Sequence, residues 1–368
     1  MRVRNGQAPA ARTRIPWQSL QSFGSERLAA LCQAVGFDGQ DTQTVRRTFE
    51  LMCAPWGKQD IEKIPAWRSD ITDDHTPFEF SLAMEGGQPE VRFLLEAQGE
   101  PTTLRSSWEA ALALNERLHR ELGVPLERFE QVKELFEPVD ERARFGLWHA
   151  VCVEPGSAPT FKVYLNPFAR GPEGAEELVR RAFERLGFTE AWRFLSTVAM
   201  RRGGLDQPIY FSLDLSEQRA ARIKVYLAHR EATAEDIESV LSLAPEYAPG
   251  EPRGFCQALQ AGVGRFHSAR PTLTCLSFTS DEPGRPSSVT LHFPIRCYAA
   301  NDADALRRIR PLLDTESRTL LEQSVKALAR RPLEDGVGLI QWVSMRRQGG
   351  GRRATFYLAT EAYGGAQP

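Results

Sequence analysis

Alternating polar and apolar residues mark one stretch of the chain, residues 222–227. Its aliphatic face has period two, which predicts a β-strand, and its opposite face carries Arg222, Lys224 and Tyr226. A half-exposed strand with its charges in water would show the same alternation. Related segments nevertheless recur at intervals of roughly sixty to seventy residues, which indicates a repeat architecture. These segments are residues 91–93, 161–165, 290–293 and 355–358.

Each segment belongs to a predicted β-hairpin, because turn residues such as Gly86-Gly87 and those at 349–351 separate two extended runs. The hairpins pair residues 76–83 with 90–96, 145–153 with 160–166, 209–215 with 221–227, 272–278 with 289–295, and 338–345 with 353–360. Apolar residues at helical spacing predict the intervening helices. These are residues 25–37, 40–53, 106–122 (opening at the capping box Ser106-Ser107-Trp108-Glu109), 172–187, 190–202, one from 233, 253–266, 302–313 and 315–330.

Five such units of two strands and two helices predict an α+β fold, in which ten antiparallel strands close into a barrel inside a ring of helices. We expect residues 16–368 to form this single domain and residues 1–15 to be a flexible tail. Aliphatic side chains then point outward to the helices, and polar side chains line a cavity for small molecules. The expected lumen-facing set is Glu79, Arg92, Lys162, Tyr164, Arg222, Lys224, Tyr226, His292 and Tyr357.

Composition adds modest limits. The net charge of −2 gives no reason to expect nucleic acid as a partner, so a cationic site must be local. No apolar run approaches the length of a membrane span, and the Arg-rich start has no apolar segment typical of a signal peptide. The six cysteines form no CxxC pair, which favours free thiols in a reducing cytoplasm over zinc or disulfides. We therefore expect a cytoplasmic protein, a monomer or homodimer, with no membrane partner.

Four lumen-facing cations, Arg92, Lys162, Arg222 and Lys224, are costly to bury unless an anion neutralises them. A diphosphate fits, held by forked Arg donors and Lys point charges. The alternative is a solvated barrel face. The Asp-rich run at 70–74 has the wrong order for an Asp-Asp-x-x-Asp magnesium box, and we interpret it as a solvated loop.

Tyr164, Tyr226 and Tyr357 lie beside these cations, where their rings could stabilise a carbocation and exclude water. Tyrosines are also common in strands, so the position alone does not prove this role. Glu79 is the lone carboxylate expected on the inward face and could accept a proton. A salt bridge between Glu79 and Arg92 is the competing interpretation.

These motifs resemble those of the dimethylallyltryptophan synthase family of aromatic (indole) prenyltransferases, over nearly the whole chain. The matching elements are Thr76-Pro77-Phe78-Glu79, Val91-Arg92-Phe93, Lys162-x-Tyr164, Arg222-x-Lys224-x-Tyr226 and Tyr357. The resemblance implies an αββα prenyltransferase barrel and metal-independent transfer of a dimethylallyl group from dimethylallyl diphosphate to an indole, with no cofactor. It also implies that Glu79 bonds the indole N–H, that the four cations hold the diphosphate, and that the three tyrosines shield the allylic cation.

The chain departs from the family pattern at several places. Thr290 and His292 stand where the family often has Gln-x-Tyr, and Trp342 stands where it often has Tyr. A lysine that assists deprotonation in some members has no match, although His149 falls nearby. We include these four residues as possible pocket residues. No arginine for a tryptophan carboxylate can be placed.

The favoured interpretation is prenylation of tryptophan or a tryptophan-derived compound in secondary (alkaloid) metabolism. A phenolic acceptor such as tyrosine is the alternative within this class. A non-catalytic barrel that binds a phosphorylated metabolite is the alternative outside it.

Overall fold

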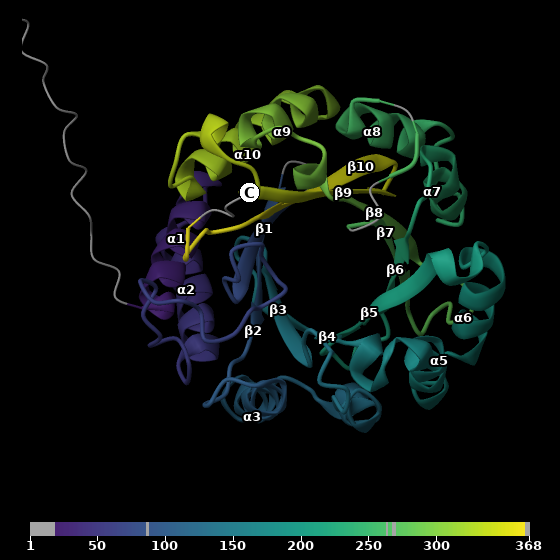
Figure 1. The fold of residues 1–368 in the computed structure, drawn as a ribbon, viewed down its shortest axis with the longest axis horizontal. Helices are drawn as coiled ribbons and strands as arrows, with labels where there is room; N and C mark the ends of the chain where they lie inside the picture. Colours follow the sequence, from purple (N-terminus) through teal and green to yellow (C-terminus); the bar gives the residue numbers. More distant parts are fainter. Residues whose placement is uncertain (1–18, 86–87, 263, 267–269, 365–368) are drawn as a thin grey trace, which may run out of the picture.

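The computed structural model describes residues 19–85, 88–262, 264–266 and 270–364. Ten antiparallel strands form a closed barrel in the order β1-β10-β9-β8-β7-β6-β5-β4-β3-β2, and the helices surround it (Figure 1). The strands are β1 (Phe78–Glu85), β2 (Gln88–Glu96), β3 (Leu147–Val153), β4 (Thr160–Leu165), β5 (Asp206–Asp214), β6 (Ile223–His229), β7 (Thr272–Phe278), β8 (Ser288–Phe293), β9 (Ile340–Gln348) and β10 (Gly351–Leu358). The predicted barrel is therefore confirmed.

Two helical segments precede each hairpin, so the chain is built from five units. The helices are α1 (Leu20–Ala34), α2 (Gly39–Cys53), α3 (Leu104–Leu122), α4 (Glu127–Glu130), α5 (Ala175–Arg185), α6 (Thr189–Phe194), α7 (Ala234–Leu241), α8 (Glu251–Gln260), α9 (Asp302–Ile309) and α10 (Thr315–Leu328). The first and last helices lie side by side (Figure 1), where the Arg27 guanidinium donates to the Ala327 carbonyl at 3.2 Å. The expected tail at 1–15 and the turn at Gly86-Gly87 lie outside the described residues.

The start of α3 differs from the expectation. The helix begins at Leu104, and its capping box joins Thr103 to Ser106, not Ser106 to Glu109. Thr103 has the extended backbone of an N-cap, and its hydroxyl accepts from the Ser106 amide at 3.1 Å. Two residues that can both cap lie within one turn, and the prediction chose the wrong one.

The hydrophobic core lies between the barrel and the helices. The outward residues of β1 and β2 include three phenylalanines, and Phe49 of α2 packs edge-on against these, Phe78, Phe80 and Phe93, with centroids 5.3–6.0 Å apart. Gly24 of α1 permits this approach, because a Cβ there would lie 2.5 Å from the Phe49 ring. Aromatic burial of this kind is a large part of what holds a helix against a sheet. No helix among the described residues combines the length and apolarity needed to cross a bilayer.

Candidate active site

The alternation in β6 sends its two faces to different surroundings. Ile223, Val225 and Leu227 are fully buried against the helices, whereas Lys224 and Tyr226 line a cavity inside the barrel. Successive inward residues are about 7 Å apart along a strand. Each strand therefore places its inward side chains at fixed depths.

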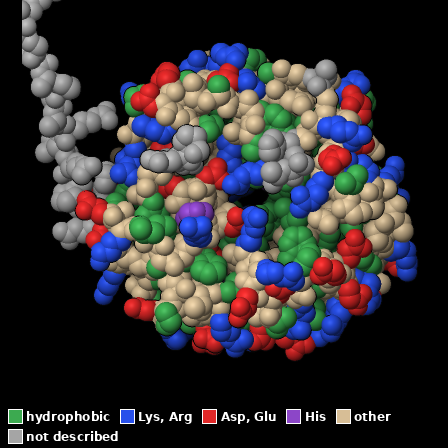
Figure 2. Space-filling view, in the orientation of Figure 1, with side chains coloured by type: hydrophobic (Ala, Val, Ile, Leu, Met, Phe, Trp, Pro, Cys, Tyr) green, Lys and Arg blue, Asp and Glu red, His purple; other side chains and the backbone are tan. Residues whose placement is uncertain are grey.

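All nine residues expected in the lumen line one cavity, which with its open mouth encloses about 790 Å³ of unfilled space. The space-filling view shows a hollow at the centre of the molecule with Lys and Arg side chains around it (Figure 2). The sequence interpretation therefore located the cavity wall, although it missed several of the residues in it.

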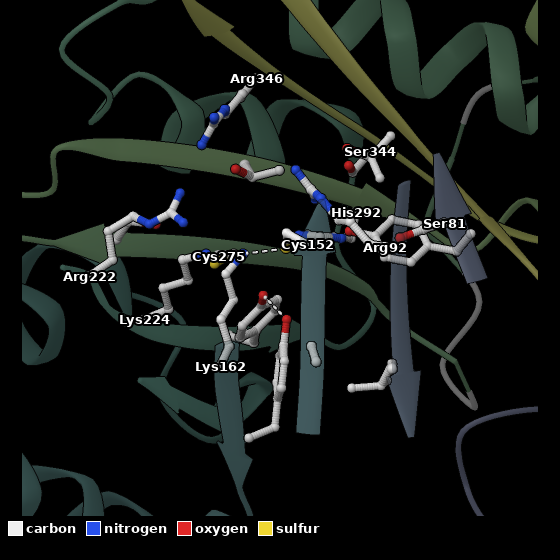
Figure 3. A pocket seen from close by; sticks show the side chains of 18 of the residues that line it. Ser81, Arg92, Cys152, Lys162, Arg222, Lys224, Cys275, His292, Ser344 and Arg346 are labelled. Atoms are coloured by element: carbon white, nitrogen blue, oxygen red, sulfur yellow. Dashed lines mark hydrogen bonds between the residues drawn. The ribbon is translucent and has the colours of Figure 1, made fainter. Parts of the chain in front are cut away.

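Arg346 of β9 and Arg353 of β10 are two cations that the interpretation missed. The period-two alternation could have indicated them, since Arg346 is two residues from the inward Ser344, and Arg353 is two residues from the inward Thr355. Arg222, Lys224, Lys162 and Arg346 project into the same space (Figure 3). The lining cations are thus six: Arg92, Lys162, Arg222, Lys224, Arg346 and Arg353.

Two further carboxylates show that Glu79 is not the lone acid of the barrel interior. Glu90 pairs with Arg92 and accepts from Arg353 at 3.0 Å, and Asp214 accepts from Arg222 Nε at 2.7 Å. Burial would raise the pKa of Glu90, but Arg92 and Lys162 lower it to about 2. Burial would likewise raise the pKa of Asp214, but Lys224, Lys162 and Arg222 lower it. Both acids are therefore ionised, and the lining cations outnumber them.

Two of the lining cations, Lys224 and Arg346, have no carboxylate in direct contact among the described residues, although Asp214 raises the pKa of Lys224 and Glu90 raises that of Arg346 from a distance. Within the described residues, no hydrogen bond or ion pair reaches the Arg346 guanidinium or the Lys224 ammonium, and Arg346 Nε is sealed from solvent. Burial lowers the pKa of Lys224 to about 7, helped by Arg222 and Lys162, so this lysine is not permanently charged as we had expected. An anion bound here would restore its proton.

Three tyrosines and His292 form an arc of rings beside the cations. Adjacent centroids along Tyr164, Tyr226, His292 and Tyr357 are 5.7, 5.4 and 5.7 Å apart. The Tyr164 and Tyr226 hydroxyls lie 3.2 Å apart. Burial holds the pKa of all three phenols above the ordinary value, so they are neutral. The arc presents polarizable ring faces and no negative charge to the cavity.

Glu79 lies at the other end of this cavity from the ion pairs. It is the second residue of β1, whereas Glu90 and Arg353 are each the third residue of strands that start at the opposite end. No hydrogen bond or ion pair holds its carboxyl within the described residues, so the expected alternative of a Glu79–Arg92 salt bridge is wrong; Arg92 pairs with Glu90 instead. Burial raises the pKa of Glu79 to about 8, with Arg296 lowering it and Asp73 raising it.

A second cavity opens at the Glu79 end of the barrel, with about 1190 Å³ of unfilled space. We call it the vestibule. It is lined by ends of β5, β6, β7 and β9 and by neighbouring loops, and includes Phe145, Tyr210, Arg230, Arg270 and Trp342. A molecule that reached the main cavity from this end would pass Glu79 before the six cations that line that cavity.

The loop at 70–74 is not the solvated loop that we expected. Ile71 is buried against Phe145 and Trp148, and Asp73 forms an ion pair with Arg296, with 3.0 Å between Oδ2 and Nε. Asp70 pairs with Arg144 at 3.1 Å. The loop therefore folds over the vestibule end, with two of its acids engaged by arginines. Within the described residues, no group of three or more His, Cys, Asp or Glu side chains is placed to hold a metal ion.

The four possible pocket residues divide into three cases. Thr290 and His292 line the main cavity, and Trp342 lies in the vestibule. His149 is wrong as a pocket residue, because it faces the helices and its Nε2 lies 2.8 Å from Asn115 Oδ1 of α3. Its neighbours Ala150 and Cys152 take the inward positions of β3.

The dependence of kcat/KM on pH should differ between the two substrates. Lys224 loses its charge as pH rises through about 7, so kcat/KM for a prenyl diphosphate should fall there. Glu79 gains its charge as pH rises through about 8, so kcat/KM for an acceptor should rise there. Steady-state kinetics across pH 5–10 measure both. Lys224→Arg should remove the fall but not the rise, and parallel profiles for the two substrates would contradict these assignments.

The family model described as tryptophan dimethylallyltransferase matches residues 25–326 of the chain. The chain belongs to the tryptophan dimethylallyltransferase family. As a family member, the protein is an aromatic dimethylallyltransferase, and the alternative of a non-catalytic barrel is set aside.

Solved structures of related tryptophan dimethylallyltransferases superpose along nearly the whole chain. The 6-dimethylallyltryptophan synthase from Micromonospora olivasterospora, in complex with DMASPP and Trp, is 32% identical with a TM-score of 0.85, covering 95% of this chain and 99% of that one. The 5-dimethylallyltryptophan synthase from Streptomyces coelicolor is 31% identical with a TM-score of 0.83, covering 94% and 99%. Xanthone prenyltransferase B of Emericella nidulans is 24% identical over 81% of this chain and 77% of its own length.

Proposed function

We propose that this enzyme transfers the dimethylallyl group of dimethylallyl diphosphate to an indole acceptor, tryptophan or a compound derived from it, without a metal ion. The observation that carries the proposal is the cluster of six lining cations, three of which (Arg92, Arg353 and Arg222) share just two paired carboxylates, Glu90 and Asp214, among the described residues. A bound diphosphate supplies the missing negative charge. The cluster therefore takes the place that magnesium occupies in metal-dependent diphosphate chemistry.

Ionisation is the first step. The bond between the allylic carbon and the diphosphate oxygen breaks, and its electron pair leaves with the diphosphate. Charge then grows on the leaving oxygens, where Lys224 and Arg346 have no direct hydrogen bond or ion pair to other described residues and feel Asp214 and Glu90 only from a distance. Donors that are already in place when this charge develops stabilise the transition state more than the ground state.

Capture is the second step. The ring arc of Tyr164, Tyr226 and Tyr357 stabilises the allylic cation and keeps water from it. An indole bound from the vestibule end would direct its N–H to Glu79 and its carbocycle to the cation. The Glu79 carboxylate raises electron density in the ring as it accepts that hydrogen bond.

The direct test is turnover. Isotopically labelled dimethylallyl diphosphate should be incubated with tryptophan, cyclic dipeptides containing tryptophan, other indoles and tyrosine. Product formation with an indole is the expected result. Turnover with tyrosine or another phenol alone would overturn the indole proposal but not the family assignment.

Chelation tests the metal proposal. Since six cationic side chains surround the anion site, we expect EDTA to leave most of the prenylation activity intact. The measurement is the initial rate in EDTA, with and without added magnesium. A complete loss of activity that magnesium restores would contradict a metal-independent reaction.

A phenolic acceptor is the second candidate, and it is favoured by the likeness to a xanthone prenyltransferase. A phenol could donate its O–H to Glu79 in the same way as an indole donates its N–H. The acceptor panel above separates the two candidates.

A further inference from the structure

His292 differs from every other described histidine in its hydrogen bonding. It is 7% exposed and lines the main cavity, yet neither ring nitrogen has a hydrogen-bond partner in the described residues, and neither is sealed from the cavity. By contrast, His149 bonds Asn115, and His229 lies 2.8 Å from Asp206 and 2.7 Å from Thr274. A buried imidazole with two open nitrogens needs an explanation.

The position of this imidazole is in the middle of the ring arc. Tyr226 lies on one side with its centroid at 5.4 Å, and Tyr357 lies on the other at 5.7 Å. Figure 3 shows His292 among the side chains that line the cavity. Burial, then Lys224 and Arg92, lower the pKa of His292 to about 3, so the ring is neutral and one nitrogen keeps a free lone pair.

The reaction has a need that Glu79 does not meet. When a carbon–carbon bond forms between the allylic cation and the ring, the attacked carbon still holds its hydrogen. That C–H bond must break, its electron pair must return to the ring, and the proton must reach a base. Because the proposed role of Glu79 is to hold the indole N–H, we assign this second proton to a different base.

Other lining groups near the ring arc are poor bases. Burial keeps the three tyrosines and Cys275 protonated by raising their pKa values. Glu90 and Asp214 are held in ion pairs at the far end. Lys224 lines the same cavity, but a bound diphosphate keeps its ammonium protonated. His292 is therefore the neutral base that remains among these groups.

We propose that His292 is a catalytic residue, the base that takes the proton from the alkylated ring carbon. This inference rests on the proposed function. The imidazole becomes an imidazolium beside the released diphosphate, whose negative charge stabilises it. The proton leaves to solvent when the products depart, and the site returns to its starting state.

A substrate isotope effect provides the test. Tryptophan deuterated at the indole carbons should be compared with ordinary tryptophan in the wild type, His292→Phe and His292→Tyr. Both variants keep a ring in the arc but remove the base. We expect kcat to fall roughly 10²-fold in both and a larger primary isotope effect than in the wild type, because proton loss becomes rate-limiting. Imidazole added to His292→Ala should recover part of the lost rate.

Controls keep the outcomes distinct. Melting temperature and affinity for inorganic diphosphate should match the wild type, which shows that the barrel and its anion site are intact. An unchanged isotope effect, with lost turnover appearing as dimethylallyl alcohol, would overturn the proposal and assign His292 to cation shielding. Failure of the wild type to prenylate any indole would instead overturn the proposed function, and deuterated tyrosine would then serve as the probe for His292.

Discussion

Replacing Lys224 by methionine is expected to lower kcat on the order of 10²–10³-fold while the protein stays folded. The ammonium group is unpaired within the described residues and lies among Arg222 and Lys162, which lower its pKa. Its charge therefore opposes folding of the empty barrel and acts only when a diphosphate is present. Methionine keeps a similar length and apolar stem but removes that charge.

The measurement is kcat for dimethylallyl diphosphate together with the melting temperature of the ligand-free protein. Removal of a repelled buried charge should leave the melting temperature unchanged or higher. Thr290→Val is a matched control, because it changes a neutral residue of the same cavity. A fall in melting temperature that parallels the loss of activity would assign Lys224 a structural role.

Replacing Glu79 by glutamine is expected to reduce prenylation by roughly 10²-fold, the scale of a positioned base. Glutamine has nearly the same size and keeps one acceptor oxygen, but it cannot carry the negative charge that polarises an acceptor N–H. Because burial raises the pKa of Glu79 to about 8, the contrast with the wild type should be largest above that pH. The readouts are kcat and kcat/KM for each substrate.

Glu90→Gln is the matched control for this variant. The two positions carry the same substitution inside one barrel, but Glu90 pairs with Arg92 and Arg353. We expect Glu90→Gln to act on the affinity for dimethylallyl diphosphate and Glu79→Gln to act on the acceptor. Normal kcat/KM for the acceptor in Glu79→Gln would rule out its catalytic role.

Local sequence was sufficient to predict which residues line the barrel, but not which of them form ion pairs with each other. The alternation around Lys224 is a property of one strand, so it predicted both the strand and the inward face. The pairing of Glu90 with Arg353 joins β2 to β10 across β1, where the opposing residue is the small Ala83. The pattern of residues within one strand does not predict which residues of β2 and β10 lie at the same level of the barrel.

The predictions for His149 and for the loop at 70–74 were wrong for a similar reason. Both faces of β3 are apolar apart from this histidine, so its direction depends on Asn115 of a helix about thirty residues earlier. Ile71 is buried only because Phe145 and Trp148 arrive from another unit. Arg346 and Arg353, in contrast, could have been found by extending the alternation of β9 and β10.

Closure of the barrel places residues from the two ends of the chain on adjacent strands. Ser81 of β1 is paired with Tyr357 of β10, and Glu79 and Tyr357 line the same cavity. During synthesis the site cannot exist until the last strand has left the ribosome, and in refolding it cannot exist until the first and last units meet. In a refolding experiment, the time at which prenylation activity appears therefore reports when the barrel closes. We expect this activity to recover later than the circular-dichroism signal of the helices.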